Sequence, residues 1–231
     1  MRKGMSFFYC FVITATLFVA YLGSEIVSVM AENTPVKRAH CIILDAGHGG
    51  VDGGTISCDG KLESAYNLEI TLRLNSLLNF LGHETVMIRT SDVSVYTKGE
   101  TIAQKKVSDL RERVRIVNET KNAVLLSIHQ NYFSDSRYRG AQVFYADTDG
   151  SRELAKFLQS NLISTVNPGS TRMSKKSSGI YLMEHIRQPG VLIECGFLSN
   201  AEESYKLSTP EYQKQLCSVI AASVSSFLSN T

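Results

Sequence analysis

The sequence of 231 residues contains no tryptophan and only four prolines. These shortages argue against a carbohydrate-binding platform of large aromatic rings and against a proline-rich linker. Five cysteines are too few for a protein that depends on a disulfide scaffold. An excess of one charge is also missing, because 24 Lys and Arg nearly balance 22 Asp and Glu. Nucleic acid is therefore not expected as a partner, since phosphate recognition needs a concentrated basic surface.

The composition that remains is that of a globular protein. Apolar residues make up 43% of the chain and charged residues 20%, which is not typical of a disordered protein. The sequence contains no internal repeat and no low-complexity segment, so it predicts a single domain without appended wall-binding repeats.

The first 31 residues predict export. Arg2 and Lys3 precede an uncharged run of 19 residues, 5–23, which as a helix would extend about 28 Å. Small residues at 29–31 then precede a polar stretch, as at a signal peptidase site. We expect 1–31 to be a signal peptide or N-terminal membrane anchor, with cleavage favoured, and we expect no other membrane contact. A short linker, 32–40, then leads to the domain at 41–231.

Strand-like and helix-like segments alternate from residue 41 onward, which is typical of an α/β fold. We therefore predict a twisted, mainly parallel sheet of about six strands with helices on both faces. The expected strands are Cys41–Asp45, Thr85–Thr90, Ala123–Ile128, Ala141–Tyr145, Ile180–Met183 and Val191–Phe197. The expected helices are Leu62–Leu81, a helix around Leu110–Val117, Glu153–Ser164 and Tyr212–Leu228.

The first predicted strand ends in the glycine-rich sequence DAGHGG (45–50). A dinucleotide-binding fingerprint is the nearest competing interpretation, but Asp52 stands where its third glycine belongs. The next helix also begins about ten residues too late to aim its N-terminus at a phosphate. Glycines around a histidine instead allow a sharp turn that brings the His48 imidazole into a crowded site.

Three further polar residues stand where strands or helices meet the same edge of such a sheet. His129 follows the third strand, Glu63 lies in the first turn of the first helix, and Glu194 lies inside the last strand. A buried carboxylate is costly unless it is paired, metal-bound or catalytic. Two histidines and a glutamate match a catalytic zinc site with one position open to water, whose proton a nearby carboxylate can take. Each residue alone also fits an ordinary structural role, and the spacing does not decide between them.

Other candidate residues have weaker support. His185 lies in a loop near the last strand and is a reserve ligand, whereas His40 and His83 are interpreted as ordinary polar residues. Asn131 either orients the site or contacts substrate, or it is an ordinary turn residue at the end of its strand. Cys58 is the cysteine expected to react most readily, and we assign no disulfide.

Four blocks, found in the same order, resemble the zinc-dependent N-acetylmuramoyl-L-alanine amidases of the type 3 catalytic family. They are DAGHGG (45–50), GKLESAYNL (60–68), LLSIHQN (125–131) and LIECGFLSN (192–200). The resemblance extends from about Cys41 to Leu228. Two further stretches, 97–114 and 178–194, are similar to the germination-specific amidases of endospore formers.

This resemblance implies that His48, Glu63 and His129 bind one zinc ion and that Glu194 is the catalytic carboxylate. The implied reaction cleaves the amide bond between N-acetylmuramic acid and L-alanine of the peptidoglycan stem peptide. Many family members carry lysine directly after the zinc-binding glutamate, whereas Ser64 stands there in this chain. The missing cation is expected to change the orientation of the site or its contact with substrate.

In the spore-cortex members, peptide removal is the first step toward muramic-δ-lactam, which a separate deacetylase completes. The resemblance therefore implies functional coupling to a muramic acid deacetylase, and a location in the cell wall or the forespore intermembrane space. The loop 171–176 is either a solvated surface loop or a contact for stem-peptide carboxylates. The alternatives are another zinc peptidoglycan hydrolase, such as a carboxypeptidase or deacetylase, and a zinc-binding regulatory pseudoenzyme.

Overall fold

The computed structural model describes residues 41–230. The predicted signal peptide or anchor (1–31) and the linker (32–40), with His40, lie outside the described residues. Within 41–230, no helix is both long enough and apolar enough to cross a membrane.

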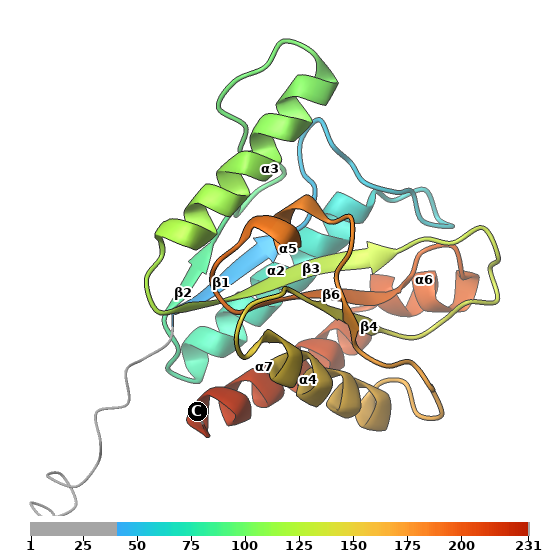
Figure 1. Ribbon diagram of the computed structural model, residues 1–231. Helices are drawn as coiled ribbons and strands as arrows, with labels where there is room; N and C mark the ends of the chain where they lie inside the picture. Colours follow the sequence, from blue (N-terminus) through green and yellow to red (C-terminus); the bar gives the residue numbers. More distant parts are fainter. Residues whose placement is uncertain (1–40, 231) are drawn as a thin grey trace, which may run out of the picture. The chain divides into compact units, whose positions relative to one another are not determined.

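A six-stranded sheet forms the centre of the domain, in the order β2-β1-β3-β6-β4-β5. All neighbouring strands are parallel except β4 and β6, which are antiparallel. The predicted α/β fold with a mainly parallel sheet is therefore confirmed (Figure 1). The strands are β1 (Cys41–Ala46), β2 (Thr85–Met87), β3 (Ala123–Asn131), β4 (Gln142–Tyr145), β5 (Lys175–Lys176) and β6 (Gly190–Phe197).

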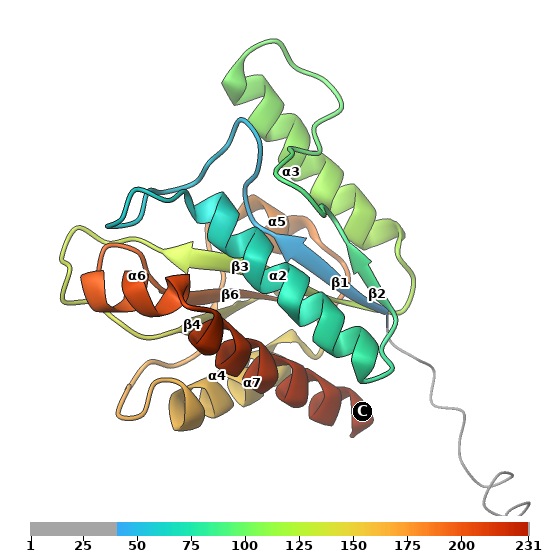
Figure 2. The same ribbon diagram turned by 180° about the vertical axis from the view of Figure 1, so that it is seen from behind.

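Helices cover both faces of the sheet, as predicted. Helices α2, α4 and α7 lie on one face, and α3 and α5 lie on the other (Figures 1 and 2). Side chains of β1 alternate between two apolar cores, because Ile42 and Leu44 pack with the α2, α4 and α7 side while Ile43 packs with the α3 and α5 side. The helices are α2 (Glu63–Phe80), α3 (Ile102–Glu119), α4 (Ser151–Thr165), α5 (Tyr181–His185), α6 (Ala201–Ser208) and α7 (Pro210–Ser229).

The predicted element order differs from the structure in three details. The expected strand Ile180–Met183 is instead the short helix α5, and the sixth strand is Lys175–Lys176. A short apolar run has no periodicity that separates a strand from a buried helical turn. Helix α6 was not predicted; the side chain of Asn200 caps it by accepting a hydrogen bond from the backbone N–H of Glu203 at 3.0 Å.

The carboxyl ends of β1, β3 and β6 meet at one edge of the sheet. Strand β3 continues to Asn131, beyond its predicted end at Ile128, and its pairing with β6 shifts register between His129 and Asn131. His129 therefore lies inside the strand, directly opposite Glu194 of β6. Parallel sheets carry their functional residues at this edge, because the connecting loops converge there.

Candidate metal centre

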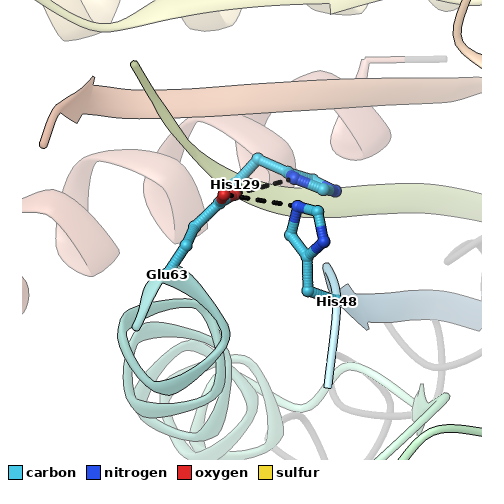
Figure 3. Close-up of side chains that lie close together, drawn as sticks. All are labelled: His48, Glu63 and His129. Carbon is cyan, nitrogen blue, oxygen red and sulfur yellow. Dashed lines mark hydrogen bonds and ion pairs between the residues drawn. The ribbon is translucent and has the colours of Figure 1, made fainter. Parts of the chain in front are cut away.

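The structure brings His48, Glu63 and His129 together from three separate elements. His48 follows β1, Glu63 is the first residue of α2, and His129 lies near the end of β3 (Figure 3). One ligand atom from each side chain lies within 4.8 Å of the other two. His48 Nε2 is 3.3 Å from Glu63 Oε2, and His129 Nδ1 is 3.1 Å from Glu63 Oε1. Residues 15 and 66 positions apart in sequence thus form one cluster.

The backbone around this cluster is tightly constrained. His48 has a φ of +62°, a left-handed conformation that non-glycine residues adopt only when the surroundings hold them there. A Cβ atom on Gly47 would lie 2.1 Å from His129 Nε2, and one on Gly54 would lie 2.6 Å from Glu63 Oε2. Gly47 and Gly54 therefore leave the space that the side chains of His129 and Glu63 occupy, and His48 itself lies in a sharp turn of this crowded loop, as predicted.

Glu63 is almost fully buried, and both of its carboxylate oxygens are hydrogen-bonded. Oε1 accepts from the side chain of Asn67 and from the backbone N–H of Gln130, both at 3.2 Å. Oε2 accepts from the backbone N–H of Thr55 at 3.1 Å. Burial alone would raise the pKa of Glu63, but the hydrogen bonds to His129 and His48 outweigh it and hold the pKa well below its usual range. Glu63 is therefore a fixed, ionised acceptor.

A second carboxylate lies on the other side of the His48 ring. Asp52 Oδ2 is 3.0 Å from His48 Nδ1, and Lys106 Nζ of α3 is 3.1 Å from the same oxygen. Burial lowers the pKa of His48, but Asp52 and Glu63 more than offset this and raise it to about 9. A cation at the cluster would replace this proton, so metal binding is expected to release it. Asp52 stands where a carboxylate typically fixes the ring orientation of a metal-binding histidine.

Two buried arginines hold the loop that carries His48. Arg113 of α3 forms an ion pair with the carboxylate of Asp45 and donates to the backbone carbonyl of His48 at 2.7 Å. Arg89 donates to the carbonyls of Gly47 at 3.0 Å and Ser64 at 2.8 Å, so it joins the loop to the start of α2. Buried carbonyl groups need such partners, and here the partners fix two of the three candidate ligands relative to each other.

Glu194 faces the cluster from β6 and has a different environment. It stands opposite His129 in the parallel pairing of β3 with β6, so the two side chains lie on the same face of the sheet. The residue retains some exposed surface, but its Oε2 atom is buried and has no hydrogen-bond partner. Burial raises the pKa of Glu194 to about 7, with Glu63 adding to the effect and His129 opposing it. A carboxyl group with this pKa exchanges protons readily at neutral pH.

The donor set fits a zinc ion. Two imidazoles and one carboxylate are the ligands that catalytic zinc sites use, with a further position left open. One donor atom from each of the three side chains lies within 4.8 Å of the other two, and the Oε2 atom of Glu194 is buried without a hydrogen-bond partner among the described residues. The residues present therefore match the group that the sequence predicted.

The other candidates lie outside the cluster. His185 stacks on Tyr181 with ring centroids 3.9 Å apart and is not among the clustered ligands. Asn131 ends β3, and its carbonyl accepts from the backbone N–H of Leu198 at 2.8 Å. Cys58 is exposed, and the cysteines at 41, 58, 195 and 217 are all free.

Sequence analysis did not predict the roles of Asp52, Arg89 or Arg113. A signal for Arg113 was present, because it lies between Leu110 and Val117 at helical spacing and thus on the apolar stripe of α3. No sequence pattern pointed to Arg89. All of its hydrogen-bond acceptors are backbone carbonyls, which do not depend on residue type.

Comparison with known proteins identifies the family. Residues 42–226 match the Amidase_3 model, described as N-acetylmuramoyl-L-alanine amidase. The chain is 37% identical over 221 residues to the germination-specific N-acetylmuramoyl-L-alanine amidase of Bacillus subtilis, covering 94% of this chain and 91% of that protein. It is 31% identical to the Bacillus subtilis amidase LytC, covering 78% of this chain but only 34% of that protein.

Solved structures give the same result. The CwlD amidase of Clostridioides difficile, determined in complex with the GerS lipoprotein, superposes with a TM-score of 0.79 at 38% identity, covering 83% of this chain and all of that one. An N-acetylmuramoyl-L-alanine amidase from Clostridium difficile 630 gives a TM-score of 0.73 at 30% identity, covering 84% of this chain and 98% of that one. The chain therefore belongs to the N-acetylmuramoyl-L-alanine amidase family and is an enzyme of that class.

Proposed function

We propose that this amidase binds one zinc ion through His48, Glu63 and His129 and uses Glu194 as its general acid and base. The proposed reaction hydrolyses the amide bond between N-acetylmuramic acid and L-alanine in spore-cortex peptidoglycan. The observation that carries the proposal is the buried, unpartnered Oε2 atom of Glu194 on the same sheet face as His129.

In the proposed reaction, the metal ion, Glu194 and the residues around His48 have separate roles. When bound, zinc supplies a Lewis acid that polarises the amide carbonyl and makes water nucleophilic at neutral pH. Glu194 takes a proton from the attacking water and then delivers it to the nitrogen of the departing L-alanine. Its raised pKa suits both steps, because the group is neither fully protonated nor a very weak base near pH 7. Arg89 and Arg113 hold the loop that carries His48 in place, and the Asp52 carboxylate lies 3.0 Å from the His48 ring.

The proposed cellular role follows from the relatives and from the N-terminal sequence. The Bacillus subtilis relative is a germination-specific amidase, and it spans nearly the whole of this chain. Residues 1–31 would direct export, and the enzyme would then act in the cell wall or the forespore intermembrane space. Removal of the peptide would free the lactyl carboxyl group. A deacetylase would then release acetate from the neighbouring nitrogen, and the freed amino group would join the lactyl carboxyl to form muramic-δ-lactam with loss of water.

The bond cleaved is tested with the purified protein and intact peptidoglycan. Release of whole stem peptides with a free N-terminal alanine, together with one zinc ion per chain, is the expected result. Release of a terminal D-alanine would instead identify a carboxypeptidase, and release of acetate a deacetylase. A protein that binds zinc but releases no product would be the regulatory pseudoenzyme.

Two further measurements test the cellular role. A strain that lacks this protein is expected to contain cortex muropeptides without muramic-δ-lactam, and an unchanged lactam content would reject the cortex role. Mass spectrometry of the mature protein is expected to find an N-terminus after residue 31. A mature protein that begins earlier would instead support the retained anchor.

A further inference from the structure

A basic cavity lies beyond the candidate metal centre, next to the start of β4. It has a volume of about 1060 Å³ and is lined by the loops 135–140 and 166–173 and by part of α6. Five cationic and three acidic residues line it, which gives an excess of two positive charges. These residues are Arg137, Arg139, Arg172, Lys175, Lys206, Asp135, Glu202 and Glu203.

The three carboxylates of this cavity already have partners. Asp135 pairs with Arg137 at 2.7 Å, and Glu202 pairs with Lys206 at 2.7 Å. Glu203 is buried and accepts from the backbone N–H groups of Gly140 and Phe197, each at 2.8 Å. Among residues 41–230, no carboxylate forms an ion pair with Arg172 or Lys175. The excess positive charge is therefore available to an incoming anion.

Arg172 is held in a fixed position. Its Nε atom donates to the carbonyl of Arg139 at 2.8 Å, and Nη1 donates to the side chain of Gln142 at 2.7 Å. The guanidinium carbon lies 4.7 Å from the ring centroid of Phe197, and the residue is only partly exposed. Nη2 has no hydrogen-bond partner within the described part of the chain. A pre-oriented guanidinium binds a carboxylate at a lower entropic cost than a mobile lysine.

The sheet register links Arg172 to the candidate catalytic residues. Glu194 of β6 stands opposite His129 on one side and opposite Gln142 of β4 on the other, so the three lie in one row across the sheet. Side chains directly opposite one another point to the same face. Because neighbouring strands lie about 4.8 Å apart, Gln142 lies on the order of 10 Å from His129. At about 3.3–3.6 Å per residue, an extended peptide covers that distance with about three residues, so a carboxylate carried by the second or third residue falls near Gln142.

We propose that Arg172 binds a free carboxylate of the stem peptide, carried by the second or third residue from the scissile amide bond. This inference rests on the proposed function, because it assumes that the scissile bond lies beside Glu194. The stem peptide would run along the row from Glu194 past Gln142. Conversion of that carboxylate to a primary amide removes its negative charge and replaces one acceptor oxygen by an NH2 donor. Because a guanidinium has only donors, the NH2 group cannot form a hydrogen bond with Arg172.

The experiment uses N-acetylmuramoyl tripeptides in which the carboxyl group of the second or third residue is free or converted to a primary amide. For the wild-type enzyme, one of the two amidations is expected to lower kcat/KM by about tenfold to a hundredfold, as for a charged hydrogen bond. In Arg172→Gln, the free and amidated substrates are expected to react at equal rates. Arg172→Lys is expected to keep part of the preference, since it keeps the charge but not the paired donors.

Arg137→Gln is the matched control. Arg137 lines the same cavity, but its charge is already paired with Asp135. This variant is expected to keep the full preference for the free carboxylate. The measured quantity is the ratio of kcat/KM for the free substrate to kcat/KM for the amidated substrate, taken within one variant. A general loss of stability in Arg172→Gln lowers both values equally and leaves this ratio unchanged.

Two results would overturn the inference while leaving the proposed function intact. One is equal cleavage by the wild-type enzyme of free and amidated substrates at both positions. The other is an undiminished preference in Arg172→Gln. A wild-type enzyme that cleaves none of the tripeptides, but hydrolyses another bond in peptidoglycan, would instead reject the proposed function, and this inference with it.

Discussion

The two carboxylates on opposite sides of the candidate metal centre, Glu63 and Glu194, differ in their hydrogen bonding and in their pKa values. On the α2 side, Glu63 is buried, both oxygens are hydrogen-bonded, and its pKa is held well below the usual range. On the β6 side, Glu194 has a buried oxygen without a partner and a pKa raised to about 7. The same chemical group is thus ionised on one side, whereas on the other side its pKa lies close to neutral pH. Environments that separate the pKa values of two titratable groups in this way assign a separate role to each.

Removal of the fixed carboxylate is the largest expected effect. Glu63→Gln should lower zinc content from one ion per chain to nearly none, because an amide is a poor zinc ligand. Amide hydrolysis should fall by a factor on the order of a thousand or more, since several kcal/mol of transition-state stabilisation would be lost. Zinc analysis and a peptide-release assay measure both. Glu69→Gln, on the same helix and paired with Lys61, is the control and should keep both properties.

Substitution of Glu194 should separate activity from metal binding. Glu194→Gln is expected to keep one zinc ion per chain and to lower kcat about a hundredfold to ten-thousandfold, the range for loss of a general acid–base group. The exposed Glu153 of α4, changed to Gln, serves as a control for loss of a carboxylate elsewhere. Near-normal turnover by the Glu194 variant would refute its assignment as the base.

A smaller effect is expected from the arginine that holds the His48 loop. Arg113→Lys keeps the positive charge but loses the planar array of donors that reaches both Asp45 and the carbonyl of His48. Zinc affinity should fall about tenfold to a hundredfold, as for other partners that orient metal ligands. Arg115→Lys is the matched control, because Arg115 lies on the same helix but is exposed. Equal zinc affinities for the two variants would show that Arg113 does not position the site.

The smallest expected effect is on the pH dependence of stability in the zinc-free protein. The usual pKa of a glutamate is about 4.3, and in the folded protein the pKa of Glu194 is raised to about 7. At pH values between these two, Glu194 is protonated in the folded state and ionised in the unfolded state. Its contribution to stability should therefore fall as the pH rises through this window, by up to about 1.4 kcal/mol per pH unit. Glu63 should behave oppositely: its contribution is present above the usual pKa and is lost in acid.

Denaturant unfolding of the zinc-free protein at several pH values measures these slopes. Glu194→Gln should remove the decline between about pH 4.3 and pH 6.5, above which the raised pKa of His48 also contributes a decline, and Glu63→Gln should reduce the loss of stability at lower pH. Slopes of the same sign for both residues would contradict the difference between the two sides of the centre.

The sequence was sufficient to predict the parts of the fold that depend on local pattern. The alternation of strands and helices predicted the mainly parallel sheet, and the polar residues at strand ends pointed to His48 and His129 as neighbours. Short segments without periodicity were the exception: Ile180–Met183 is mostly helical, and Lys175–Lys176 forms the edge strand. Such segments take their structure from tertiary neighbours that the local sequence does not record.

The supporting residues of the site were harder to predict for a related reason. Arg89 acts through backbone carbonyls, which every residue has, so no sequence pattern identifies its partners. Glu63 was predicted as a candidate ligand, but its saturation with hydrogen bonds from Thr55, Asn67 and Gln130 depends on the folded loop. The row from Glu194 to Gln142 depends on the antiparallel entry of β4 into the sheet, which local periodicity does not reveal.

The absence of a side chain at Gly47 has a consequence for how this enzyme can change. A methyl group there would occupy the volume of the His129 ring itself. The smallest possible enlargement at position 47 therefore competes with the candidate ligand His129 for the same space. Gly47→Ala is therefore expected to displace the His129 ring and to lower zinc content and amide hydrolysis together.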